Sequence, residues 1–174
     1  MGEALIKAQE GDSFKVGDKV VYSAQGVGVI DGIQETSLGG VSQNFYKISI
    51  LESGARVMVP VQMAASQGLR KVVDASTIEK VYDILRQRKV EVDTQTWNRR
   101  FRQYKEKIKT GSVFEIATVI RDLTVLKGDK ELSSGEKDML RTARGRLIKE
   151  ISIAKSIPEE SAQEELLALC EYAN

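Results

Sequence analysis

The residues with the clearest chemical pattern are basic and lie together near the middle of the sequence. Cations at such density bind polyanions, above all the phosphates of a nucleic acid. The only tryptophan of the chain, Trp97, lies among them. An aromatic side chain on a basic helix can stack on a base or wedge between two bases. Between residues 86 and 109 nine residues are basic and three are acidic, the basic ones being Arg86, Arg88, Lys89, Arg99, Arg100, Arg102, Lys105, Lys107 and Lys109.

A helix from about residue 94 to residue 109 would sort these side chains onto two faces. The cations that would share its exposed face are Arg99, Arg102, Lys105 and Lys109. We expect Phe101, Tyr104 and Ile108 to form the buried stripe of the same helix. A solvated basic face with Trp97 as an ordinary core residue would have the same composition, and these residues alone favour neither interpretation.

Histidine is absent from the sequence, and its absence excludes several classes of enzyme. Without an imidazole there is no Ser-His or Cys-His nucleophile and no histidine ligand for zinc. The single cysteine, Cys170, can form neither an internal disulfide nor a thiolate cluster, and its apolar neighbours predict a buried or half-buried thiol. We therefore expect a protein that is not an enzyme and that binds no metal, cofactor or small-molecule substrate.

The net charge of +1 is unevenly distributed along the chain. Residues 71–155 carry 20 basic and 13 acidic side chains, whereas residues 156–174 carry five glutamates and no basic residue. This asymmetry indicates a polyanion partner for the middle of the chain and a different task for its first part. No apolar run approaches the roughly 20 residues that cross a bilayer, and the N-terminus lacks the pattern of a signal peptide. We therefore expect a cytoplasmic protein.

The first 70 residues predict a small β module, because β-branched residues alternate with polar ones between glycine-containing turns. Four or five short strands would curl into a barrel-like sheet. The candidate strands are residues 19–22, 27–33, 44–51 and 55–61.

The strand over residues 55–61 presents a candidate contact surface. Alternation places its three valines toward the core and Arg56, Met58 and Pro60 on the opposite face. Because proline cannot donate to a ladder, this strand is expected at the edge of the sheet. An exposed methionine beside an arginine is typical of a protein-contact patch. An incidental surface methionine is equally consistent with the sequence.

From Asp74 onward the pattern changes to helices. Four Ser-x-x-Glu capping boxes predict helix starts, at Ser76/Glu79, Ser112/Glu115, Ser133/Glu136 and Ser156/Glu159. Apolar periodicity predicts helices over residues 112–127 and 139–154, with a last helix over residues 158–172. The triplet Arg144-Gly145-Arg146 resembles a minor-groove hook, but it lies inside a helical pattern and we reject that interpretation.

Five stretches of the sequence resemble bacterial CarD/CdnL proteins. They are FKVGDKVVYSAQGVGVIDGI from Phe14, RVMVP from Arg56, TWNRRFRQYKEKI from Thr96, ATVIRDL from Ala117 and LSSGEKDMLRTARGRLIKEI from Leu132. The resemblance implies an N-terminal Tudor-like β module that docks on the β subunit of RNA polymerase. It also implies a helical module that touches DNA at the upstream edge of the transcription bubble and stabilises the open promoter complex.

The same resemblance implies roles for individual residues. Trp97 matches the DNA wedge of the family, and the strand with Arg56, Met58 and Pro60 matches its polymerase contact. The basic residues predicted to bind DNA beside Trp97 are Arg99, Arg100, Arg102 and, from the exposed helix face, Lys105.

We therefore expect an α+β protein in three parts. Residues 1–13 would be a flexible extension, residues 14–70 the polymerase-binding β module, and residues 71–174 a DNA-contacting module of about five helices. The expected partners are the RNA polymerase β subunit, in the holoenzyme with the housekeeping sigma factor, and promoter DNA at the nucleoid, with no membrane partner. The alternative is a stand-alone protein-interaction or assembly module without direct DNA contact.

Overall fold

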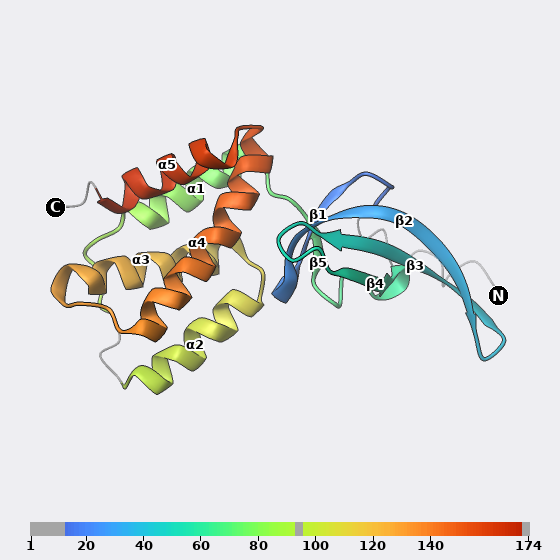
Figure 1. Ribbon diagram of the computed structural model, residues 1–174, viewed down its shortest axis with the longest axis horizontal. Helices are drawn as coiled ribbons and strands as arrows, with labels where there is room; N and C mark the ends of the chain where they lie inside the picture. The colour runs from blue at the N-terminus through green and yellow to red at the C-terminus, as the bar shows by residue number, and fades with distance from the viewer. Residues whose placement is uncertain (1–12, 93–95, 172–174) are drawn as a thin grey trace, which may run out of the picture. The chain divides into compact units, whose positions relative to one another are not determined.

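The computed structural model describes residues 13–92 and 96–171 of the chain (Figure 1). The chain divides into two compact units, Met1–Lys71 and Val72–Asn174, which we call the β unit and the helical unit. The expected extension over residues 1–13 lies, apart from Ser13, outside the described residues. No helix within the described ranges is long and apolar enough to cross a membrane. The order of elements, strands first and helices afterwards, confirms the expected α+β class.

The β unit is an antiparallel sheet of five strands in the order β4-β3-β2-β1-β5. The strands are β1 (Lys19–Tyr22), β2 (Gly26–Leu38), β3 (Val41–Ile50), β4 (Arg56–Pro60) and β5 (Leu69–Lys71). With 13 and 10 residues, β2 and β3 are longer than expected, because the turn at Gly39 and Gly40 has positive φ at both glycines and lets one hairpin extend to its tip. The sequence does not predict β5, since three residues show too little alternation to be recognised.

One face of the sheet forms the core of the β unit. Val20, Ile30, Ile48 and Val59 have no exposed surface. The burial of Val59 confirms the alternation predicted for β4. The place of β4 at the end of the strand order confirms the predicted edge position. Gly28 is required by the packing, because a Cβ there would lie 2.6 Å from Cγ2 of Ile48.

The helical unit contains five helices in its described residues, as expected. They are α1 (Ala75–Arg86), α2 (Trp97–Lys109), α3 (Val113–Asp129), α4 (Ser134–Lys155) and α5 (Glu159–Glu171). Helix α3 packs against α1, α2 and α4, and α5 lies beside α1 and α4 (Figure 1). Helix α2 is therefore attached to the rest of the unit mainly through α3 and through residues at the start of α4.

Two of the four predicted capping boxes are confirmed as helix starts. At α3 the hydroxyl of Ser112 accepts a hydrogen bond from the amide of Glu115. At α4 the box is complete, because Ser133 accepts from the amide of Glu136 while the Glu136 carboxylate accepts from the amide of Ser133. These caps satisfy amides that have no partner within the helix.

The other two capping boxes are wrong. At α1 the cap is Asp74, whose carboxylate accepts from the amide of Thr77 at 2.8 Å, because an aspartate placed two residues before Ser76 is an equally good cap. Ser156 does not begin α5. It ends α4 in the left-handed conformation, with φ 53°.

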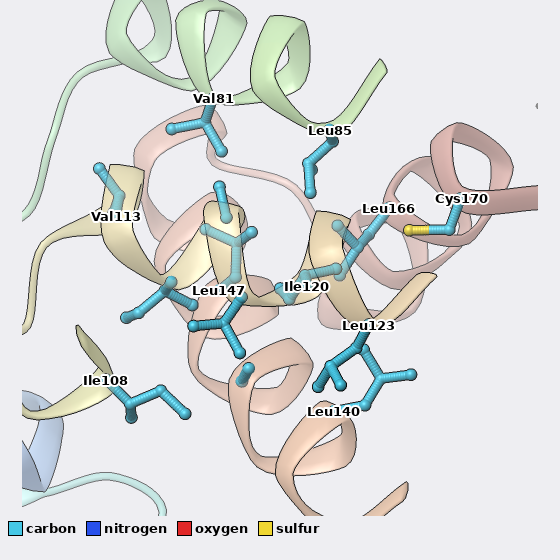
Figure 2. Packing of buried hydrophobic residues seen from close by; sticks show 14 of the residues in the cluster. Val81, Leu85, Ile108, Val113, Ile120, Leu123, Leu140, Leu147, Leu166 and Cys170 are labelled. Carbon is cyan, nitrogen blue, oxygen red and sulfur yellow. The ribbon is translucent and has the colours of Figure 1, made fainter. Parts of the chain in front are cut away.

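Side chains from all five helices meet in one apolar core (Figure 2). They include Leu85 of α1, Ile108 of α2, Ile120 and Leu123 of α3, Leu147 of α4, and Leu166 and Cys170 of α5. Burial of each such aliphatic side chain contributes roughly 1.5–3 kcal/mol. Cys170 is 9% exposed, in agreement with the prediction of a buried or half-buried thiol. This core holds α3 and α4 as the base on which α2 rests.

Candidate functional site

Helix α2 carries the predicted nucleic-acid contacts and begins at Trp97. Tyr104 and Ile108 fix its inner face to the core, as predicted, with 4% and 8% of their surface exposed. The N-cap residue Thr96 makes no side-chain cap hydrogen bond, and the first turn contains no acidic residue. The positive end of the helix dipole therefore adds to the field of the basic side chains.

Trp97 is half-buried and packs with part of its indole on the helical core. One edge of the ring lies against Gly135 in the first turn of α4, where a Cβ would come within 3.0 Å of Cζ2 of Trp97. The ring of Phe101 packs edge-on against the indole, with centroids 5.3 Å apart and planes at 62°. The indole thus combines the two roles that the sequence left open: it is anchored by packing, and part of it is still accessible.

Three of the predicted DNA-binding cations lie on the outer face of α2. Arg99, Arg102 and Lys105 are exposed, and no carboxylate in the described ranges lies within ion-pair distance of them. Lys109, in contrast, pairs with Glu106 at 3.1 Å between Nζ and Oε1. Exposed cations beside an aromatic pair suit a nucleic acid, because the cations bind phosphates and the ring offers a stacking surface.

Arg100 and Phe101 occupy each other's expected places. Arg100 is 6% exposed, whereas Phe101 is 36% exposed, so the prediction that Phe101 belongs to the buried stripe is wrong. A buried arginine requires a carboxylate, and Glu136 of α4 supplies it at 3.1 Å between Nη2 and Oε1. Arg100 is therefore an ion-pair residue with little exposed surface, and its predicted DNA contact stays a prediction that this burial does not favour.

The Glu136 carboxylate joins the first turns of α2 and α4. Its side chain is 1% exposed, its Oε2 accepts the amide of Ser133 at 2.8 Å, and its Oε1 also lies 3.5 Å from Nζ of Lys130. Burial by itself raises the pKa of Glu136, but the hydrogen bonds of Ser133 and the cations Lys130 and Arg100 outweigh it and hold this pKa below its usual range. The group is therefore charged at neutral pH and fixes α2 in place.

Sequence reasoning missed the positioning roles of Phe101, Gly135 and Glu136. For Phe101 a signal was present, since counting back in steps of four from Ile108 gives Tyr104 and then Arg100 as the inner stripe. The sequence pattern identified Glu136 only as a capping residue. For Gly135 no local signal exists, because its contact is with a residue from another helix.

The predicted polymerase-contact residues lie along the edge strand β4. Arg56 is exposed, Met58 is 48% exposed and Pro60 is partly buried. Met58 lies directly beside Lys47 of β3, and Arg56 and Met58 border a depression of about 450 Å³ that also includes Asp31. The edge thus offers a partner both a main-chain ladder and a mixed apolar and charged surface.

Two protein-family models match the sequence, the CarD-like/TRCF RID domain over residues 14–73 and the CarD C-terminal domain over residues 80–167. The chain belongs to the CarD family. A relative of this CarD-family chain from Bacillus subtilis (strain 168), the putative transcription factor YdeB, is 33% identical over 147 residues, which are 84% of this chain and 95% of the relative. The solved structure of CdnLNt from Myxococcus xanthus is 46% identical and covers 37% of this chain and 92% of its own, with a TM-score of 0.31.

The two family models and the Bacillus relative confirm the family that the sequence resembles. The family and the name of the Bacillus relative connect the chain to transcription. The match to the RID domain model ends at residue 73, close to the division between the two units after Lys71.

Proposed function

We propose that this CarD-family protein regulates transcription initiation by binding the RNA polymerase β subunit and the upstream edge of the promoter bubble, and that it thereby stabilises the open complex. The observation that carries the proposal is the state of Trp97, which is anchored by packing yet accessible at the start of a basic helix. The protein would act without catalysis, in the cytoplasm at the nucleoid, beside the holoenzyme with the housekeeping sigma factor.

The helical unit would act on DNA through two kinds of contact. Arg99, Arg102 and Lys105 would bind phosphates and set the position of α2 without reading sequence. Trp97 would lie at the junction of paired and melted DNA. Unstacking a base step costs a few kcal/mol, and stacking of an aromatic ring on the freed base returns roughly 1–3 kcal/mol. Such a contact favours the melted promoter because the closed duplex offers no freed base.

The β unit would bind the polymerase through strand β4. An edge strand can extend a partner sheet by main-chain hydrogen bonds, while alternate side chains provide specificity. Met58 would supply the apolar anchor, flanked by Arg56 and by Pro60. Attachment to the polymerase would raise the local concentration of the helical unit at the promoter, so its own affinity for DNA need not exceed the micromolar range.

The salt dependence of DNA binding tests the DNA contact. Each phosphate contact contributes about 0.9 to the slope of the logarithm of the affinity against the logarithm of the salt concentration. We expect Arg99→Ala and Arg102→Ala each to lower this slope by about 1 for full-length protein on promoter DNA. Lys109→Ala is the matched control, because Lys109 is paired with Glu106 and its loss should leave the slope nearly unchanged.

A slope that is small in wild type and insensitive to all three substitutions would contradict DNA contact by α2. The protein would then be a module that binds protein only. Tight, sequence-specific binding of free protein to DNA would contradict the proposal as well, because phosphate contacts and one wedge carry little sequence information.

A further inference from the structure

A second surface of the helical unit is a groove of about 790 Å³ bounded by the end of α3, by α4 and by α5. Its apolar floor consists of Leu132, Leu140, Ile148 and Leu167. Cavities of roughly 300–1,000 Å³ with mainly apolar walls are typical of binding sites. The volume and lining of this groove therefore suit a ligand or the side chains of a partner.

The groove lies on a different side of α4 from Trp97. At about 100° per residue, Ile148 in the groove and Gly135 beneath Trp97 point roughly 140° apart around the helix axis. A partner in the groove would therefore not compete for the contact made by the indole.

Gly145 lines the groove in the middle of α4, where packing does not require a glycine. A Cβ at this position would meet no atom within 4 Å. Glycine inside a helix costs about 1 kcal/mol relative to alanine, so the residue is unfavourable for the helix itself. Its effect is to leave the groove open along α4.

The rim of the groove is strongly basic and is formed by Lys127, Lys130, Lys137, Arg141 and Arg144. Among the described lining residues the single acidic one, Glu131, is paired with Lys137 at 3.0 Å. Arg144 is partly buried, and its Nε is buried without a hydrogen-bond partner in the described part of the chain. Its guanidinium adds positive charge to the rim, and such a charge strengthens hydrogen bonds to a carboxylate.

We propose that this groove binds an acidic amphipathic helix of a partner protein. Apolar residues of that helix at i, i+4 and i+7 would enter the floor, and its Asp and Glu side chains would pair with the basic rim. Nucleic acid also carries negative charge, but its phosphates gain nothing from the apolar floor. The charge and the floor together favour a peptide with both properties.

The test uses the full-length protein and a labelled synthetic helical peptide with leucines at i, i+4 and i+7 and glutamates elsewhere. Fluorescence anisotropy should show saturable binding. A control peptide of the same composition with its leucines spread around the helix should bind at least about tenfold more weakly, a difference of about 1.4 kcal/mol. Equal binding of the two peptides would show attraction by charge alone and would overturn the proposal.

Gly145→Leu supplies the decisive variant, because leucine favours the helix and its side chain fills the groove. We expect peptide binding to fall at least tenfold, while the unfolding equilibrium constant falls by about fivefold, equivalent to about 1 kcal/mol. Gly145→Ala is the control for folding, because its methyl group faces open space. Unchanged peptide binding to the folded leucine variant would overturn the proposal.

Charge reversal provides a matched pair. Arg141→Glu at the rim should weaken peptide binding, whereas Arg86→Glu on α1 should not, although both arginines are exposed and paired with an aspartate three residues earlier. Equal effects of the two variants would show attraction by overall charge and would overturn the proposal. Displacement of the peptide by duplex DNA that itself fails to bind Gly145→Leu would place a nucleic acid in the groove and refute the peptide. Neither polymerase nor promoter is present, so the result is independent of the proposed function.

Discussion

Glu136→Gln tests whether a buried ion pair holds the DNA-contacting helix in place. Glutamine preserves the shape of the side chain and can still accept the amide of Ser133, so the cap changes little. Arg100, however, loses its carboxylate at a site where its side chain is 7% exposed. Removal of one partner from a buried pair costs about 3–5 kcal/mol. The pair with Lys130, which is 48% exposed, adds less than about 1 kcal/mol because solvent screens it.

We therefore expect the substitution to lower the free energy of unfolding of the helical unit by about 3–5 kcal/mol. Urea unfolding followed by tryptophan fluorescence measures this quantity cleanly, because Trp97 is the only tryptophan and lies in the helical unit. With a slope of about 1–3 kcal/mol per molar urea, the midpoint should fall by at least about 1 M. Asp83→Asn is the matched control, since Asp83 forms an exposed pair with Arg86 and its change should cost less than about 0.5 kcal/mol.

A double-mutant cycle separates the ion pair from other effects of the substitution. Arg100→Met removes the buried cation, and combining it with Glu136→Gln removes both charges. The double variant should be more stable than the sum of the single losses implies, with a coupling energy of about 1–3 kcal/mol. Losses that add within about 0.5 kcal/mol, or a single loss below 1 kcal/mol, would refute the view that this pair positions α2.

Three further predictions concern the other contacts. Met58→Asp places a charge on the exposed face of β4, so the β unit should stay folded. Binding of full-length protein to the polymerase β subunit, measured by interferometry, should weaken at least about tenfold. Unchanged binding would place the contact elsewhere. Gly135→Leu displaces the Trp97 ring from α4, so tryptophan emission should shift to the red, and an unshifted spectrum would mean that α4 does not hold the indole. Hydrogen bonds from Lys155 and Tyr82 hold the pKa of Glu165 below its ordinary value of 4.5. The stability that this provides is complete above about pH 4.5 and is lost as the pH falls through the lowered value. Between about pH 6 and pH 3 the melting temperature of Glu165→Gln should therefore fall less steeply with decreasing pH than that of wild type. Equal slopes for the two proteins would contradict this role.

Much of the fold could be predicted because its signals are local. The alternation in β4, the glycine turn before β3 and the apolar stripes of α3 and α4 all lie within short windows of sequence. Local signals also compete, which is why Asp74 caps α1 in place of Ser76. The three residues of β5 form a strand because they pair with β1, and a pattern within three residues cannot indicate that pairing.

The candidate site could be located from the sequence but not assembled. The basic residues and Trp97 mark α2, whereas the exchange of Arg100 and Phe101 depends on a carboxylate 36 residues away in sequence. Which side chain is buried is decided there by the partner that the fold supplies, and not by the polarity of the side chain. The position of Trp97 likewise depends on a residue from another helix, because only a glycine at position 135 leaves room for the indole.

The lifetime of open promoter complexes under competitor challenge tests the central claim most directly. With polymerase and full-length protein, Trp97→Ala should reduce the stabilisation of open complexes by about five- to hundredfold, the equivalent of roughly 1–3 kcal/mol of stacking, while binding to polymerase alone stays intact. Phe114→Ala is the control, because Phe114 is an aromatic with 39% exposure at the start of α3 and should leave the lifetime unchanged. A folded Trp97→Ala protein that stabilises open complexes as well as wild type would contradict the account and make Trp97 a core residue only.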